Sequence, residues 1–377
     1  MLEILLWISI LIIIFAYFGY PASLILIGMI KNKVVDKDEI YPYVTMIVAA
    51  FNEERKVENK ICNTLKIEYP KEKFQVIFVS DESTDKTDQI ILKYICQGIE
   101  YLRIENRKGK ENAQKEAIKY AKGDIIIFSD VATAINSNGI KNIVSNFADP
   151  SVGCVSSEDR IIKKNGSHKG EGTYVSYEMW LRKVESKVHS IVGLSGSFFA
   201  ARKEVCKNFS SEMQSDFRTV LNSIELGLRG VCDSEAIGYY ENVADEKREF
   251  DRKVRTVIRG LTVFFRHMEF LNPFVYGIFS YELFCHKLLR WLVPLFLIIV
   301  FYSNTILAFS SSRYFILLIC QVLFYSVAFV VRFANIKVEN TLFKIPVYFS
   351  TVNLSILVAW WKYIKGKRIV MWSPSER

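Results

Sequence analysis

Four stretches of the chain contain no charged residue, and they constrain its fold more than any other feature. They cover residues 4–30, 291–312, 314–331 and 345–361. A bilayer core of roughly 30 Å is crossed by about 20 apolar helical residues, so the first two stretches are long enough to span it and the last two are marginal. A secretory signal peptide is a weaker interpretation of the first stretch, because the apolar part is too long and lacks a small-residue cleavage site. The sequence therefore predicts a transmembrane helix over residues 1–30, about three more over residues 291–364, and a tail at 365–377.

Basic residues beside the first stretch indicate which side of the membrane holds the rest of the chain. Lys31 and Lys33 follow it directly, and Lys and Arg beside a span favour the cytoplasmic side. We therefore expect a multi-pass protein of the cell membrane whose region 31–290 lies in the cytoplasm. Four spans would place the C-terminus outside, although residues 362–368 are rich in Lys and Arg. Either the charge rule fails there, or one of the two shorter segments does not span.

The overall charge narrows the class of partner. A net charge of +9 fits a protein that lies against an anionic inner leaflet. Residues 251–290 mix basic and aromatic side chains, which favours amphipathic helices on the membrane surface before the next span. No recognised nucleic-acid-binding motif accompanies the charge, so nucleic acid is not expected as a partner. The seven cysteines include no CxxC pair, so neither a zinc site nor a redox pair is indicated.

The region between the apolar ends alternates two kinds of pattern. Strand-like apolar runs occupy residues 43–52, 74–85, 100–104 and 124–130, and helix-like segments occupy residues 57–67, 87–95 and 110–121. This alternation predicts right-handed βαβ units and an α/β fold with a mostly parallel central sheet. Such sheets bind ligands at the carboxyl ends of their strands, which is where Asn52, Asp81 and Asp130 fall. Neither a GxGxxG nor a GxxxxGK[ST] motif is present, so dinucleotide and P-loop sites are poorly supported.

Seven short motifs follow one another in this region. They are VAAFNEE (48–54), SDESTDKT (80–87), RKGKENAQKEA (107–117), FSDVAT (128–133), GLSGSFFAARKEV (193–205), SDFR (215–218) and RKVRT (252–256). In this order they resemble the motifs of an inverting, membrane-bound family 2 glycosyltransferase with a GT-A fold. Each motif alone is weak, but together they cover roughly residues 43–260. The resemblance implies a nucleotide-sugar-binding domain over residues 43–250, between the apolar ends of the chain.

The resemblance also implies roles for individual residues. The general base that takes the proton from the acceptor hydroxyl is expected to be Asp216. The nucleotide is expected to meet Ala50, Asn52, Glu53, Asp81 and Lys110. The diphosphate and a divalent cation, Mg²⁺ or Mn²⁺, are expected beside Asp130, Arg252 and Arg255. The turn that faces the acceptor is expected to contain Ser195, Gly196 and Ser197.

Most of these residues also have a plainer interpretation. Asp81 and Asp216 could each be a helix cap or a loop acid, Lys110 with its neighbour Arg107 could be solvated surface charge, and Gly196 could belong to an ordinary tight turn. Asp130→Asn is therefore expected to reduce activity or change the metal requirement, and Asp216→Asn to abolish transfer.

The sequence departs from the family pattern at three places. Ser80 replaces the first acid of the nucleotide motif, and Ala132 replaces the second acid of the metal motif. Since Mg²⁺ keeps several waters and uses one or two protein carboxylates, Asp130 alone is chemically sufficient. Where the family has Gln and Trp, this chain has Arg252 and Thr256. The missing Trp disfavours a processive synthase of the cellulose or hyaluronan kind.

The leading hypothesis is a membrane-embedded inverting hexosyltransferase. It would move a sugar from a nucleotide sugar, expected to be UDP-linked, to a lipid-linked or polysaccharide acceptor at the cytoplasmic membrane face. Two alternatives stay open. One is a processive polysaccharide synthase that extrudes its polymer, which product length would distinguish. The other is a non-catalytic binding or scaffold protein, which predicts that Asp81, Asp130 and Asp216 do not converge.

Overall fold

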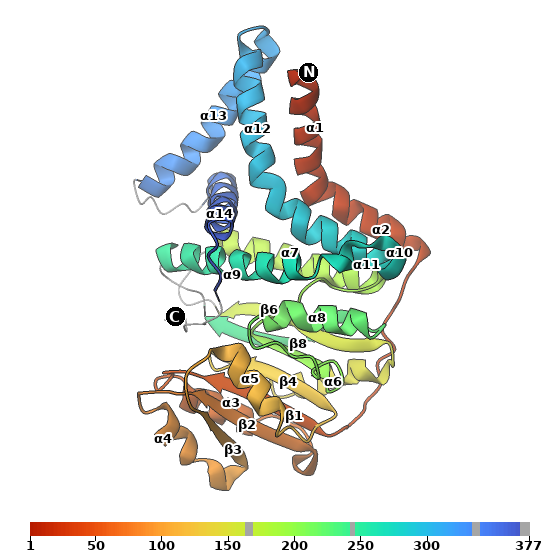
Figure 1. Ribbon diagram of the computed structural model, residues 1–377, viewed down its shortest axis with the longest axis vertical. Coiled ribbons are helices and arrows are strands. Elements are labelled where there is room, and N and C mark those ends of the chain that lie inside the picture. Colours follow the sequence, from red (N-terminus) through yellow and green to blue (C-terminus); the bar gives the residue numbers. More distant parts are fainter. Residues whose placement is uncertain (163–168, 242–245, 334–339, 370–377) are drawn as a thin grey trace.

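The computed structural model describes residues 1–162, 169–241, 246–333 and 340–369. In Figure 1 the described chain forms three levels. A mixed sheet with its helices lies at one end, long apolar helices lie at the other, and helices that run across the long axis lie between them. Part of the expected tail, residues 370–377, lies outside the described residues.

The first half of the sheet is parallel and follows the predicted alternation. Its strands are β1 (Val44–Ala50), β2 (Phe74–Asp81), β3 (Ile99–Ile104) and β4 (Ile125–Asp130), and they lie in the order β3-β2-β1-β4. The connecting helices are α3 (Val57–Leu65), α4 (Thr87–Leu92) and α5 (Lys110–Ile118). All seven residues of β1 are buried, as expected for a strand covered by helices on both faces. The α/β prediction is confirmed, and Asp81 and Asp130 end their strands as expected.

The second half of the sheet is mixed. β7 (Phe198–Arg202) runs antiparallel to both β4 and β6 (Val152–Ile162), and β6 pairs in parallel with β8 (Arg229–Glu241). The short β5 (Thr133–Ile135) pairs with the far edge of β8. The helices of this half are α6 (Gly139–Ser145) and α8 (Ser215–Glu225). Among the described residues the eight strands form one continuous sheet.

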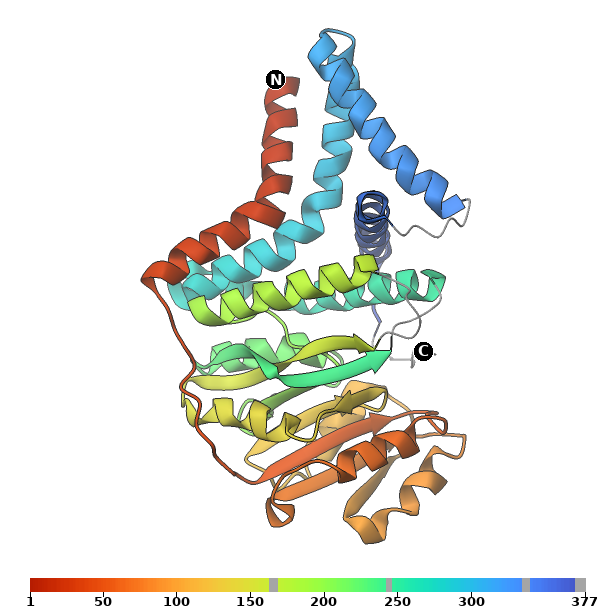
Figure 2. The same ribbon diagram turned by 180° about the vertical axis from the view of Figure 1, so that it is seen from behind.

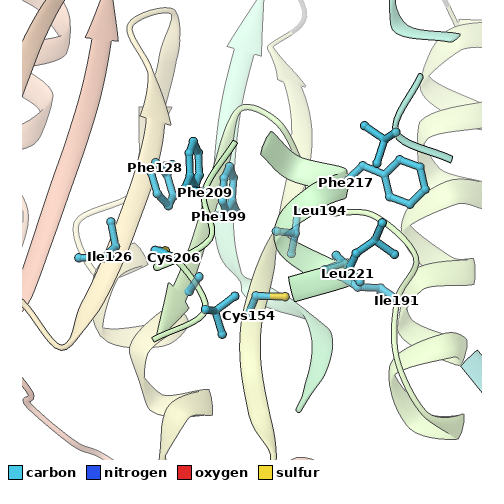
Figure 3. Close-up of a cluster of buried hydrophobic side chains, with 14 of the residues drawn as sticks. Ile126, Phe128, Cys154, Ile191, Leu194, Phe199, Cys206, Phe209, Phe217 and Leu221 are labelled. Carbon is cyan, nitrogen blue, oxygen red and sulfur yellow. The ribbon is translucent and has the colours of Figure 1, made fainter. Parts of the chain in front are cut away.

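An aromatic stack holds the two halves of the sheet together. Phe128 of β4 stacks on Phe199 of β7 at 4.7 Å between ring centroids, and on Phe209 at 5.3 Å. Figure 3 shows these rings side by side, with Leu221 of α8 farther along the same core. Burying such rings favours folding by removing large apolar areas from water. The core thereby fixes β4, and with it the carboxylate at the end of that strand.

Two helices lie crosswise between the sheet and the apolar helices, namely α7 (Lys169–Val188) and α9 (Glu246–Arg266) (Figures 1 and 2). Polar and apolar residues segregate strongly in α9, and its apolar side packs on α14 (Thr341–Ile364). Short segments follow, at Met268–Leu271, α10 (Pro273–Tyr276) and α11 (Ile278–Leu283). An amphipathic helix such as α9 suits the boundary between a polar domain and a membrane.

Four described helices are long and apolar enough to cross a membrane. They span Leu2–Ile30, Ile278–Ala308, Ser312–Val331 and Phe343–Ile364. Their number equals that of the charge-free stretches. The second begins before residue 291, because α11 continues through a π-helical segment into α12 (Arg290–Ala308). Membrane association is thus supported by length and composition at both ends of the chain.

Candidate functional site

A cavity of about 220 Å³ lies beside the carboxyl end of β4. It collects most of the predicted site residues from distant parts of the sequence. The predicted residues that line it are Glu53, Lys110, Asp130, Ser195, Gly196, Ser197, Asp216, Arg252 and Arg255. The other predicted residues, Ala50, Asn52 and Asp81, lie outside the lining set. Asp130 and Asp216 therefore converge on one cavity, whereas Asp81 belongs to a neighbouring edge.

Asp130 ends β4 and is held by a lysine. Lys110, the first residue of α5, pairs its ammonium with the Asp130 carboxylate and also donates a hydrogen bond to the carbonyl of Gly196 at 3.0 Å. The Lys110 side chain is nearly buried and the Asp130 side chain is 21% exposed, so Asp130 remains accessible from the cavity. Carboxylate oxygen is the donor that Mg²⁺ and Mn²⁺ favour. Asp130 thus fits a site in which phosphate oxygens and water complete the shell of a divalent cation.

A second lysine, Lys60, fixes the backbone and side chain on either side of Asp130. The buried Lys60 of α3 donates to Ser129 Oγ at 2.7 Å and to the carbonyl of Thr133 at 2.6 Å. These contacts bracket the turn that carries Asp130. Burial lowers the pKa of Lys60 to about 7, although the charge of Asp130 acts in the opposite direction. The sequence analysis missed Lys60, but its position next to Ile61 on the buried side of the helix was a usable signal.

Asp216 lies in the first turn of α8 and presents an unusual carboxylate. Gln214 Nε2 donates to its Oδ2 at 3.1 Å, while its Oδ1 is buried and has no hydrogen-bond partner among the described residues. An added Cβ at Gly196 would come within 2.9 Å of Oδ2, so glycine is needed there for this close approach. A buried carboxylate oxygen without a partner is costly. The Asp216 side chain as a whole is half-buried and lines the cavity, so its carboxylate can accept a proton from a hydroxyl bound there.

Asp159 of β6 completes the turn that faces Asp216, and the sequence analysis missed it. Its Oδ1 accepts hydrogen bonds from Ser195 Oγ at 2.6 Å and from Ser197 Oγ at 2.9 Å. The two serines flank Gly196, so one carboxylate orders the whole turn. Asp159 also lines the cavity. Because β6 finds its place through pairing with distant strands, no local pattern marked this residue.

Helix α9 contributes a row of arginines to the cavity. Arg252, Arg255 and Arg259 all line it, since residues three and four apart share one helix face. Arg259 pairs with Glu111, and Arg252 binds both carboxylate oxygens of Glu249 at 2.6 Å. Burial and the charges of Arg259 and Arg252 lower the pKa of Arg255. Like charges brought together in this way favour a bound anion. The same spacing could have identified Arg259 from the sequence.

The other residues predicted to meet the nucleotide, of which Asp81 is the one predicted to contact the base, lie at the ends of β1 and β2. Asp81 is buried, and its carboxylate accepts hydrogen bonds from the backbone N–H of Gly109 at 2.8 Å and of Lys108 at 3.2 Å. Asn52 accepts from the N–H of Thr84 at 2.8 Å. Ala50 is buried at the end of β1. These contacts join the loops that follow the first three strands.

Backbone strain marks the same edge. The backbone φ angles of Asn52, Glu82 and Asn106 are 52°, 60° and 62°, values that residues other than glycine rarely adopt. Strained residues of this kind persist where the surroundings fix them, and they cluster at ligand sites. Arg107 lies here too, with its guanidinium 3.5 Å from the centroid of the Phe51 ring. The edge is therefore a rigid, polar platform next to the cavity.

Comparisons with known proteins give a family match over part of the chain and several partly matching relatives. Residues 45–209 match the family model described as "Glycosyl transferase family 2". A beta-monoglucosyldiacylglycerol synthase from Nostoc sp. is 26% identical over 185 residues, which cover 46% of this chain and 39% of that protein. A poly-beta-1,6-N-acetyl-D-glucosamine synthase from Staphylococcus aureus is 29% identical over 138 residues, which cover 36% of this chain and 32% of that protein. The chain thus matches well under half the length of these relatives.

One solved structure is similar over almost the whole chain. It is a mannosyltransferase from Pyrobaculum calidifontis in complex with GDP-Man and Mn²⁺. The two structures superpose with a TM-score of 0.77 at 19% identity, covering 98% of this chain and 100% of the other. At this identity the likeness shows the fold alone.

Proposed function

We propose, from the premise that residues 45–209 form a glycosyl transferase family 2 domain, that this chain is a membrane-bound inverting glycosyltransferase. It would transfer a sugar from a nucleotide sugar to a hydroxyl group of a membrane-associated acceptor. The single observation that carries the proposal is the pairing of functions in one cavity. Asp216 offers a carboxylate to a hydroxyl, and Lys110 with the arginines of α9 offers positive charge to a diphosphate in the same cavity.

The donor would be held by charge on one side of the cavity. Lys110 sits at the N-terminus of α5, where the helix dipole also favours an anion. Arg255 of α9 lines the same cavity and can bind phosphate oxygens in a bidentate manner. Asp130 would hold the divalent cation, which when bound offsets the negative charge that develops on the leaving diphosphate. The nucleobase would lie at the Asp81 edge.

The transfer itself needs one proton movement and one displacement. The Asp216 carboxylate takes the proton of the acceptor hydroxyl, and the acceptor oxygen forms a bond to the anomeric carbon. The bond from that carbon to the diphosphate oxygen breaks, and the nucleoside diphosphate leaves with the electron pair. Because the base and the leaving group stand on opposite sides of the sugar, the anomeric centre inverts.

A processive polysaccharide synthase is the second candidate. The resemblance to the poly-N-acetylglucosamine synthase favours it, whereas Thr256 in place of the family Trp disfavours it. The convergence of Asp130 and Asp216 on one cavity speaks against a non-catalytic scaffold, whereas Asp81 lies outside that lining. Product length separates the first two, since a synthase yields a ladder of long products and a single-step enzyme yields one.

The deciding experiment uses the purified full chain in native lipid extract. Radiolabelled UDP-sugars and GDP-sugars are supplied separately, with Mg²⁺, with Mn²⁺ and with a chelator. We expect label to enter the lipid or glycan fraction from one donor class, with less transfer when the chelator is present. Binding of no nucleotide sugar, or binding without any transfer or hydrolysis, would contradict the proposal. Protease protection in sealed vesicles tests whether the domain faces the cytoplasm.

A further inference from the structure

Helix α14 is one of the four described helices that are long and apolar enough to cross a membrane, but it is also the least apolar of them. In Figures 1 and 2, which show opposite sides of the molecule, α1 (Leu2–Ile14), α12 and α13 (Ser312–Phe333) reach the end of the long axis that is farthest from the sheet. Both views look almost straight along α14, which lies next to the level of the crosswise α7 and α9. The orientation of α14 therefore differs from that of the other three.

Both ends of α14 contact one other helix, α9. Near the start of α14, the ring centroid of Tyr348 lies 5.4 Å from the ammonium of Lys253. Near its end, the ring of Tyr363 stacks on that of Phe265 with 5.7 Å between centroids, and Ile369 packs against the hydrophobic cluster that the two helices share. Tyr348 and Tyr363 are about 22 Å apart along a helix that rises 1.5 Å per residue. α14 could therefore cross a bilayer core of roughly 30 Å only if α9 crossed it alongside.

Helix α9 does not have the composition of a membrane-crossing helix. Its sequence, EKREFDRKVRTVIRGLTVFFR, is rich in charged residues, which are costly in a hydrocarbon core. Three of its arginines line the cavity beside the sheet, namely Arg252, Arg255 and Arg259. Another side of the helix is apolar, and there Val254 and Ile258 pack in one cluster with Ala359 of α14. α9 thus lies between the cavity and α14, on the polar side of the membrane boundary.

Helix α14 has an exposed apolar face. Phe343, Leu354, Trp361 and Ile364 are exposed, and their spacing of 11, 7 and 3 residues places them on one side of an α-helix. Ala359, on the other side, is buried in the cluster with α9. Apolar side chains of a helix at the membrane surface lie at the boundary between headgroups and acyl chains, where Trp is enriched. The partner that fits this face is therefore a lipid surface.

We propose that α14 lies in the plane of the membrane, at the membrane surface nearer the sheet, with its exposed apolar face in the bilayer and its other side on α9. The chain then crosses the membrane three times, through Leu2–Ile30, Ile278–Ala308 and Ser312–Val331. Three crossings place the C-terminal segment on the same side as the sheet. The basic residues at 362–368 and Lys31 and Lys33 then share one side, in agreement with the charge rule. This arrangement goes beyond the reaction proposed above and holds whichever reaction the cavity performs.

Labelling of single cysteines in sealed membrane vesicles tests the side of the C-terminal segment. In the full chain, the exposed Cys62, Cys96 and Cys320 are replaced by serine to give the blank. Three further versions each carry one exposed cysteine: the restored Cys96 on the side of the sheet, Lys367→Cys, or Ser310→Cys in the turn between α12 and α13. A membrane-impermeant maleimide is applied to vesicles of both orientations, and labelling is divided by that after detergent. We expect Lys367→Cys to follow Cys96 and Ser310→Cys to show the reverse pattern. Lys367→Cys that follows Ser310→Cys overturns the inference.

Depth measurements on the exposed face test whether α14 lies flat. A nitroxide is attached to Phe343→Cys, Leu354→Cys or Ile364→Cys in the blank protein, which is then placed in nanodiscs. The collision rates of the nitroxide with oxygen, which prefers the bilayer, and with a water-soluble nickel chelate report its depth. We expect the three positions to have similar depths. In a crossing helix, residues 343 and 364 would lie about 31 Å apart in opposite leaflets, with residue 354 near the bilayer centre.

Helix α13 is the matched control, because it also exposes apolar side chains along its length. Phe315→Cys, Val322→Cys and Phe329→Cys carry the same nitroxide at exposed positions. Their depths should change along the helix, with the greatest depth at residue 322. A depth profile of α14 that matches that of α13 would mean that α14 crosses the bilayer, and the inference would be wrong.

Discussion

Two groups of buried charged residues lie at different levels of this molecule, and they contrast in how their polar atoms are used. The first lines the candidate site, the cavity beside the sheet. The second, the interfacial cluster, joins the N-terminal span, α7 and the start of α12, and consists of Tyr20, Glu178, Glu185, His286 and Arg290. His286 contacts Glu185 through Nδ1 at 2.5 Å and Glu178 through Nε2 at 2.7 Å. Tyr20 donates to Glu185 at 2.6 Å, and Arg290 donates to Glu178 at 3.0 Å.

The contrast separates charges that hold elements together from charges that await a ligand. In the interfacial cluster, both ring nitrogens of His286 contact carboxylates of α7, and the carboxylate of Glu178 contacts His286 and Arg290. Buried carboxylate oxygens without a hydrogen-bond partner among the described residues occur in both places, at Asp216 and at Glu185, but of these two only Asp216 lines the cavity. Residue types are similar in both places, so type alone does not reveal function. Substitutions in the two places should accordingly affect different measurements.

The largest effect is expected at Asp216. Asp216→Asn keeps the size of the side chain and an oxygen for the hydrogen bond from Gln214 Nε2, but it removes the base. Transfer should fall by about 10³-fold, within the range for loss of a general base, while donor binding and the melting temperature stay close to those of the wild type. Initial rates, a donor-binding isotherm and a thermal melt check the three parts.

Glu212→Gln is the matched control for that variant, because Glu212 lies nearby on the surface and pairs with the exposed Arg266. Its transfer rate should equal that of the wild type. Substantial turnover in Asp216→Asn would remove Asp216 from the mechanism and would erase the contrast between the two groups.

The opposite pattern is expected in the interfacial cluster. Glu178→Ala removes the carboxylate that His286 and Arg290 contact. Breaking a buried ion pair in this way lowers the free energy of unfolding by about 3–5 kcal/mol. The variant should melt well below the wild type in detergent, yet below its melting temperature it should keep its KM for the donor.

Lys187→Ala controls for substitution on the same helix, because Lys187 is exposed near the end of α7. It should melt with the wild type. A Glu178→Ala protein that is stable but has lost donor binding would mean that the interfacial cluster takes part in catalysis, against the comparison.

The sequence was informative where the signal was local. The apolar run before Asp130 and the helix-forming segment after Lys110 each depend on neighbouring residues, so the βαβ order of the first half was predictable. Lys60, Asp159 and the contacts of His286 were not predicted. Each depends on a partner that is distant in the sequence. The separation is at least 69 residues for Lys60, at least 36 for Asp159 and at least 101 for His286. Strand pairing and helix packing decide which side chains meet across such distances. The hydrophobic periodicity of the sequence does not reveal these contacts.

Lys60 gives the finest test of the comparison. It lies beneath the candidate site, yet its ammonium donates hydrogen bonds to protein oxygens, as the charged groups of the interfacial cluster do. Its folded pKa of about 7 lies below the ordinary 10.5. Between these two values the unfolded chain binds more protons than the folded chain, so Lys60 makes stability rise with pH by up to about 1.4 kcal/mol per pH unit. Below pH 7 the lysine is protonated in both states, and its contribution no longer changes with pH.

Lys60→Met removes this dependence while keeping a long apolar side chain. Melting temperatures of both proteins are measured from pH 6 to pH 9 without donor or divalent cation. The wild type should gain stability relative to the variant as the pH rises above about 7, and the difference should be flat below it. Lys66→Met, at the exposed end of the same helix, should follow the wild-type curve throughout. Parallel curves for the wild type and Lys60→Met would mean that Lys60 stays charged across this range, so that it acts on Asp130 as a permanent counter-charge.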